Sequence, residues 1–179
     1  RLMGLTPFET AASLMPFEIN TLSQRLIHDL KYNNYQDISK LFGKAIAENI
    51  RQNNRYTQID YIIPLPLHPK RVKKRGYNQC NLIAKELSAM TGIEWSKKAL
   101  LKTKETKSQK ELSATERKQN LSDAFYADSE IVKGKSIILL DDVCTTGSTL
   151  KSAAEKLKMA GAEYIIALTC CKTEEKQKL

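Results

Sequence analysis

The stretch SIILLDDVCTTGSTLKSAAEKLKMAGAEYIIALT, residues 136–169, decides the fold of this chain. Residues 136–140 and 164–169 are short apolar runs of the kind that form buried strands. Between them, residues 149–160 have helical spacing and stop at Gly161, and glycine is common just beyond helix ends. A strand, a helix and a strand of these lengths indicate a right-handed crossover between parallel strands. The stretch therefore predicts an α/β fold.

The rest of the chain fits this class. Apolar side chains at helical spacing predict two helices within residues 1–55. Residues 59–65 form another apolar run that ends in prolines, and residues 77–90 again have helical spacing. We therefore expect an N-terminal helical segment, residues 1–55, followed by an α/β domain, residues 56–179. Its sheet should be mainly parallel and flanked by helices.

The composition is that of an ordinary globular protein. The chain has 179 residues, of which 41% are apolar, enough to bury a core. No apolar run approaches the roughly 18 residues that a membrane span needs, so we expect no membrane insertion. Four cysteines occur without a C-x-x-C pair, which favours a reduced, cytoplasmic protein. His28 and His68 stand far apart, so we expect no zinc site within this chain.

The positive charge is unevenly placed along the chain. The net charge is +9, and basic residues crowd residues 70–75 and 97–118. Clustered positive charge attracts polyanions, either nucleic acids or phosphorylated metabolites. A solvated surface explains the second cluster equally well. Charge alone does not choose among these readings.

Two acids and a hydroxyl-rich loop follow the predicted strand at residues 136–140. In an open parallel sheet, ligands bind beyond the carboxyl ends of the strands, where Asp141 and Asp142 are expected to lie. The residues that turn the chain into the next helix are Thr145, Thr146, Gly147, Ser148 and Thr149. Their amides, at the positive end of a helix dipole, suit a phosphate, and the carboxylates suit sugar hydroxyls. The G-x-G-x-x-G and P-loop patterns of other phosphate-binding proteins are not met.

The string DDVCTTGST, residues 141–149, closely resembles the ribose-5-phosphate signature of type I phosphoribosyltransferases. The resemblance implies that Asp141 and Asp142 contact the ribose hydroxyls and that the five loop residues wrap the 5-phosphate. The implied ligand is phosphoribosyl pyrophosphate (PRPP) or a similar ribose 5-phosphate. It implies Mg²⁺ as the cofactor, carried by the substrate, with no direct ligand from the chain and with Asp141 and Asp142 as metal ligands at most indirectly.

A second resemblance narrows the family. The segments PLPLHPKRVKKRGYNQ, residues 64–79, and LIHDLKY, residues 26–32, are similar to those of the ComF/GntX group of phosphoribosyltransferase-like proteins. Arg71 and Arg75 suit bidentate phosphate contacts better than lysine does. A polar stretch, residues 103–111, carries Lys104 and Lys107 and is either a flexible loop that covers the site or a plain surface loop.

The resemblance implies displacement of pyrophosphate from the ribose C1 by an acceptor that the sequence does not identify. Residues 1–55 would form the hood over the acceptor pocket, because only a short tail follows the last predicted strand. ComF-type proteins commonly begin with a zinc-finger-like segment, and either this member lacks it or it lies upstream of Arg1. The group also suggests a link to DNA uptake in competence. The alternatives are a non-catalytic PRPP sensor, or an accessory protein that binds single-stranded DNA beside the competence machinery.

Overall fold

The computed structural model describes residues 7–56, 58–104 and 124–173. Among these residues, five strands form one sheet in which all neighbours are parallel. In spatial order they are β1 (Thr10–Phe17), β7 (Tyr164–Thr173), β6 (Ser136–Cys144), β2 (Tyr61–Pro64) and β3 (Glu94–Trp95). Strands β4 (Leu100–Lys102) and β5 (Phe125–Ala127) pair antiparallel apart from that sheet. The α/β class with its mainly parallel sheet is confirmed.

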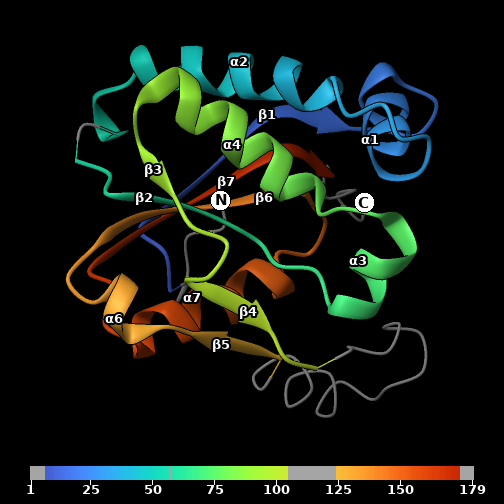
Figure 1. Cartoon of the computed structure of the whole chain (residues 1–179). Coiled ribbons are helices and arrows are strands. Elements are labelled where there is room, and N and C mark those ends of the chain that lie inside the picture. Colours follow the sequence, from blue (N-terminus) through green and yellow to red (C-terminus); the bar gives the residue numbers. More distant parts are fainter. Residues whose placement is uncertain (1–6, 57, 105–123, 174–179) are drawn as a thin grey trace, which may run out of the picture.

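Helices cover both faces of the sheet (Figure 1). One face carries α1 (Leu22–Tyr32), α2 (Ile38–Arg51) and α4 (Gln79–Thr91), and the other carries α6 (Ser129–Val132) and α7 (Ser148–Met159). Helix α3 (Pro69–Arg75) follows β2, and a 3₁₀ turn, η1 (Asn54–Tyr56), follows α2. None of the helices in the described ranges has the length and apolar character that a bilayer crossing requires.

The central strand β6 separates two hydrophobic cores. Ile137 and Leu139 pack with residues of α7, whereas Ile138 and Leu140 pack with residues of α1, α2 and α4. All four side chains are fully buried, and burying one of this size stabilises the fold by about 1.5–3 kcal/mol. The unbroken apolar run in the sequence therefore reflects burial on both faces of a parallel sheet.

Strand β1 lies in the segment that was predicted to be helical only. Both predicted helices are present as α1 and α2, but β1 precedes them and pairs with β7 at the sheet edge. Apart from Thr10, its residues are not β-branched, and Pro16 is tolerated because the strand has one neighbour only. The Glu9 carboxylate fixes its start by accepting a hydrogen bond from the Ile165 amide at 2.6 Å. Tertiary pairing thus overrides a weak local preference.

Two further elements differ from the prediction. Strand β6 runs on through Asp141 and Asp142 to Cys144, because β7 also continues and pairs with it there. The basic residues after β2, for which no helix was predicted, form α3, with His68 accepting a backbone hydrogen bond at its start. Gly76 ends this helix in a left-handed conformation, with a φ of 90°.

Gly43 lets helix α2 approach helix α4 closely. A methyl group at this position would lie 2.7 Å from Cβ of Glu86, well inside van der Waals contact. We expect Gly43→Ala to lower the free energy of unfolding by about 1–3 kcal/mol, because it forces the two helices apart. Denaturant unfolding measures this change, with the exposed neighbour Lys44→Ala as the control. Equal midpoints for the two variants would contradict the close approach.

Asp60 joins the starts of β2 and β6. Its carboxylate accepts a hydrogen bond from the Ser136 amide at 2.8 Å and pairs with Lys135 Nζ at 3.2 Å. The Ser136 amide, assisted by Lys135, lowers the pKa of Asp60 against the opposing effect of burial. The stabilisation is therefore present above the unfolded-state pKa, about 4, and is lost as the pH falls through the lower folded-state pKa.

This linkage gives a pH-dependent prediction for Asp60→Asn. The difference in unfolding free energy between wild type and the variant should be largest near neutral pH and should shrink below about pH 4. Urea unfolding at several pH values measures it. A difference that stays constant with pH would contradict the assigned contacts.

Candidate functional site

Strand β6 brings its two aspartates close together in different surroundings. Asp141 lines a small hollow with the loop that follows β6. Asp142 lies against α1 and α4. Both side chains are buried, with 9% and 3% of their surfaces exposed. The two acids are therefore not equivalent, although the sequence presents them as a pair.

Asp142 is held by residues of two helices. Its Oδ2 accepts hydrogen bonds from Lys31 Nζ at 2.7 Å and from Gln79 Nε2 at 2.9 Å. Lys31 lies in the last turn of α1, and Gln79 is the first residue of α4. Burial alone would lower the pKa of the Lys31 ammonium, but the Asp142 carboxylate raises it above the ordinary value. Lys31 is therefore charged at neutral pH and compensates the buried carboxylate.

Asp141 has a different environment. Its Oδ1 accepts a hydrogen bond from the Asp142 amide at 2.8 Å and lies 3.7 Å from Cys80 Sγ. Burial, together with the neighbouring Asp142 charge, raises the pKa of Asp141 to about 8. Asp141 consequently holds a proton over much of the neutral range. In its protonated form, Asp141 is able to donate a hydrogen bond to a ligand.

Cys80, Asp141 and Asp142 form a cluster with the residue types of a cation site. Each offers one ligand atom, and these atoms lie within 4.8 Å of one another. Lys31 Nζ already occupies the space next to Asp142, and burial raises the pKa of the Cys80 thiol well above its ordinary value. Mg²⁺ prefers six oxygen ligands and keeps several of its waters. This buried set with its own ammonium does not fit a directly bound Mg²⁺.

The loop after β6 has the features of an anion site. All five predicted loop residues line the hollow that Asp141 also lines: Thr145, Thr146, Gly147, Ser148 and Thr149. Gly147 has a φ of 74° and stands at the start of α7, where it offers no side chain to cap the helix. Helix-start amides without such a cap are suited to anions. The hollow measures about 20 Å³, room for roughly one water, so a phosphate would sit at its mouth.

Helix α3 brings Arg71 to the same edge of the sheet. Burial and the charge of Arg71 lower the pKa of Lys102 on β4, whereas Asp141 raises it. Lys102 therefore lies within electrostatic reach of both Arg71 and Asp141. Its ammonium also lies 5.3 Å from the centre of the Phe125 ring. The structure thus adds Lys102 to the basic residues expected near the aspartates.

Arg75 makes its contacts within the protein. Its guanidinium donates a hydrogen bond to Gln79 Oε1 and lies 5.4 Å from the centre of the Tyr32 ring. Because Gln79 in turn donates to Asp142, Arg75 is linked to the carboxylate through one side chain. Its predicted role as a phosphate ligand stays a prediction, and it would require Arg75 to exchange these partners.

Most of the predicted covering loop lies outside the described residues. Lys104 is exposed just after β4, and Lys107 is not among the residues that the structure describes. The expectation that residues 103–111 close over the site therefore stays a prediction.

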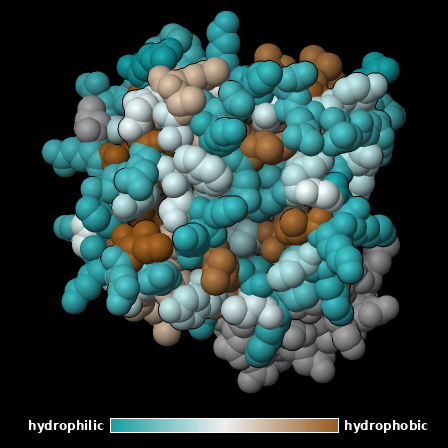
Figure 2. Space-filling view, in the orientation of Figure 1, coloured by the Kyte–Doolittle hydropathy of each residue, from teal (hydrophilic) through white to brown (hydrophobic). Residues whose placement is uncertain are grey.

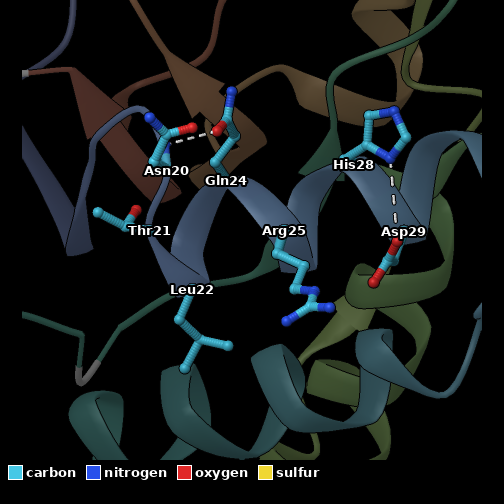
Figure 3. A pocket seen from close by; sticks show the side chains of 7 residues that line it. All are labelled: Asn20, Thr21, Leu22, Gln24, Arg25, His28 and Asp29. Carbon is cyan, nitrogen blue, oxygen red and sulfur yellow. Dashed lines mark hydrogen bonds and ion pairs between the residues drawn. The ribbon is translucent and has the colours of Figure 1, made fainter.

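A larger hollow is lined by α1 and by the two residues before it. It has a volume of about 700 Å³ and is shown in Figure 3. Its lining consists of Asn20, Thr21, Leu22, Gln24, Arg25, His28 and Asp29. None of the predicted site residues is among them. The face of the molecule in Figure 2 is mostly hydrophilic, with small separate apolar patches. The candidate site is therefore identified by the polar groups that converge at Asp141, and not by the volume of a hollow.

Sequence reasoning assigned no site role to Lys31, Gln79, Cys80 or Lys102. Lys31 and Gln79 lie within the two segments that carried the family resemblance, so the signal was present in the sequence. Their contact with Asp142 was not, because Gln79 and Asp142 are 63 residues apart in the chain. Asn78 caps α4 by accepting a hydrogen bond from the Cys80 amide at 3.0 Å.

Comparison with known proteins identifies the class. Residues 31–179 match the phosphoribosyl transferase domain family. Glutamine PRPP amidotransferase from B. subtilis has a similar fold, with a TM-score of 0.53 and 17% identity over 79% of this chain and 30% of that one. Adenine phosphoribosyltransferase from Leishmania tarentolae gives 0.51 and 10% identity over 90% and 92%. The chain belongs to the phosphoribosyl transferase domain family and has the type I fold.

Sequence relatives narrow the assignment. DNA utilization protein YhgH of Shigella flexneri is 34% identical over 151 residues, which cover 83% of this chain and 66% of that protein. Competence protein F of Haemophilus influenzae is 34% identical over 145 residues, or 78% and 63%. This chain therefore spans just under two thirds of the length of these relatives. It belongs to the ComF-type group of phosphoribosyltransferase-like proteins, as the sequence motifs predicted.

Proposed function

We propose that this chain binds PRPP together with Mg²⁺ at the carboxyl edge of its sheet and transfers the phosphoribosyl group to an acceptor. The observation that carries the proposal is the shared hollow of Asp141 and the loop at the start of α7. A carboxyl group next to helix-start amides and hydroxyls matches the two ends of ribose 5-phosphate, its ring hydroxyls and its phosphate. Mg²⁺ reaches the site on the pyrophosphate, as part of the substrate.

The two aspartates have different roles in this proposal. Asp141 lines the hollow and contacts a ribose hydroxyl directly. Asp142, held by Lys31 and Gln79, places a fixed negative charge beside the ring. Arg71 and Lys102 neutralise the pyrophosphate from the neighbouring elements.

Transfer requires displacement of pyrophosphate from the ribose C1 through a cation-like transition state. The chain contributes orientation of the two reactants and charges placed in advance. Helix α1 already reaches the site through Lys31, which supports the N-terminal segment as the hood over the acceptor. Closure by residues 103–111 would exclude water.

A calorimetric titration tests the proposal. Mg²⁺ and PRPP are titrated into wild type and into Asp141→Asn/Asp142→Asn, and we expect affinity to fall at least about tenfold, the size of one charge-assisted hydrogen bond. Asp60→Asn, at the opposite edge of the sheet, is the control and should bind like wild type. No binding to wild type would refute the proposal. Release of pyrophosphate with some member of a panel of bases and amines distinguishes a transferase from a sensor.

Single-stranded DNA is a second candidate ligand, favoured by one observation that the sequence did not offer. Tyr32 is 67% exposed and lies against the Arg75 guanidinium, next to the basic helix α3. Single-strand binding proteins combine exposed aromatic rings with basic surfaces in this way. The names of the relatives, which concern DNA utilization and competence, agree with such a role beside the competence machinery in the cytoplasm.

Salt dependence separates this candidate from PRPP binding. Binding of an oligo-dT strand should weaken steeply with salt and should be lost in Tyr32→Ala, but it should be unaffected by Asp141→Asn. Binding that Tyr32→Ala leaves unchanged would rule out the surface formed by Tyr32 and α3.

A further inference from the structure

Lys31 places a fixed positive charge beside the buried carboxyl groups. Its Nζ lies 2.7 Å from Asp142 Oδ2, and the side chain is mostly buried. Gln79 fixes the same oxygen from α4, so Asp142 is held between two helices. No other cation contacts the Asp142 carboxylate in the part of the chain that the structure describes.

We propose that the Lys31 ammonium takes the place that a protein-bound divalent cation would occupy beside Asp142, so that this carboxyl pair binds no metal of its own. Lys31 is then a positioning residue that fixes the direction of the Asp142 carboxyl group. Any metal at the site must arrive on the substrate. That last statement rests on the proposed function, whereas the exclusion of a resident metal does not.

The ligand geometry supports this role. Cys80, Asp141 and Asp142 bring three potential ligand atoms within 4.8 Å of one another in a buried position, which without Lys31 would be a negatively charged cluster. A buried carboxylate without a partner is unstable and takes up a proton or another cation. Divalent ions bind such clusters and deprotonate their ligands. The cluster is thus a latent cation site that Lys31 fills.

The neighbouring basic residues do not replace Lys31. Arg75 donates to Gln79 rather than to the carboxylate, and Lys102 acts on Asp141 from β4. Lys31 also lowers the pKa of Asp141, although burial and Asp142 raise it more strongly. One ammonium therefore serves both carboxyl groups.

Binding of Mn²⁺ in the absence of PRPP tests the proposal. Electron paramagnetic resonance counts bound Mn²⁺ in wild type, Lys31→Met and Lys31→Arg. We expect no stoichiometric binding to wild type or Lys31→Arg, and one ion per chain in Lys31→Met with at least about tenfold higher affinity. The matched control is Lys158→Met, which removes an ion pair with Glu9 of similar length, 2.6 Å, at a distant position and should gain no Mn²⁺ site. A merely structural Lys31 would produce the same result as this control.

A double variant completes the design. Lys31→Met/Asp142→Asn removes both charges, so it should melt at a higher temperature than Lys31→Met and should lose the Mn²⁺ site. One Mn²⁺ per wild-type chain, or a folded Lys31→Met without Mn²⁺, would overturn the proposal. If Lys31→Met does not fold, one Mn²⁺ bound per chain of wild type or of Lys31→Arg would still overturn the proposal. Failure to bind PRPP would instead count against the proposed function alone.

Discussion

Gly147→Ala should weaken PRPP binding by roughly 10- to 100-fold, the effect of losing one hydrogen bond to a charged group. The φ of 74° at this position is left-handed, and alanine adopts it only at a cost of about 1–2 kcal/mol. The loop therefore relaxes, and the amides at the start of α7 turn away from the phosphate. Calorimetric titration of PRPP with Mg²⁺ measures the loss.

Gly134→Ala is the matched control for this substitution. Gly134 has a φ of 70°, so alanine meets the same backbone strain there, and no atom lies within 4 Å of the added methyl group. It precedes β6, at the end of the strand opposite to Asp141. Both variants should lose similar stability, but only Gly147→Ala should lose affinity. Equal affinities would mean that the loop does not hold the phosphate.

Phe42→Ala should lower the free energy of unfolding by about 3–5 kcal/mol, the largest effect on stability that we predict. Phe42 lies on α2, is 1% exposed and belongs to the core between the sheet and helices α1, α2 and α4. The substitution leaves a cavity that the surrounding helices fill only in part. For a chain of this size, the melting temperature should fall by about 10 °C. Thermal denaturation followed by circular dichroism measures it.

Leu41→Ala provides the control on the same helix. Leu41 is the preceding residue, and it is 54% exposed. Its replacement should change the free energy of unfolding by no more than about 0.5 kcal/mol. If both variants melted at the same temperature, α2 would not pack with the face that the structure shows.

Much of the fold was predictable because its central elements carry strong local patterns. The crossover at residues 136–169 has two apolar strands and a helix with a glycine end, and the structure contains β6, α7 and β7 there. Strand β1 was not predictable in this way, since its residues favour a strand only weakly and β7 supplies the pairing. Helix α3, in the basic segment after β2, was also not predicted, because the capping role of His68 was not recognised.

The candidate site, like the fold, was predictable from the sequence only in part. The loop residues 145–149 and both aspartates lie within nine consecutive positions, so the sequence alone brought them together. Their different surroundings were not predictable, because Asp142 contacts Lys31 and Gln79 whereas Asp141 lies beside Cys80.

By itself, the sequence DDVCTTGST predicted the kind of ligand, a ribose 5-phosphate, because consecutive residues form both the acidic strand end and the loop at the start of the next helix. Only the tertiary structure decided how the acids are used. Lys31 and Gln79 come from helices far away in the chain, and packing of α1 and α4 on one face of the sheet brings both to Asp142. Because Asp142 is buried, the charge of Lys31 and the hydrogen bond from Gln79 replace the water that would otherwise stabilise its carboxyl group.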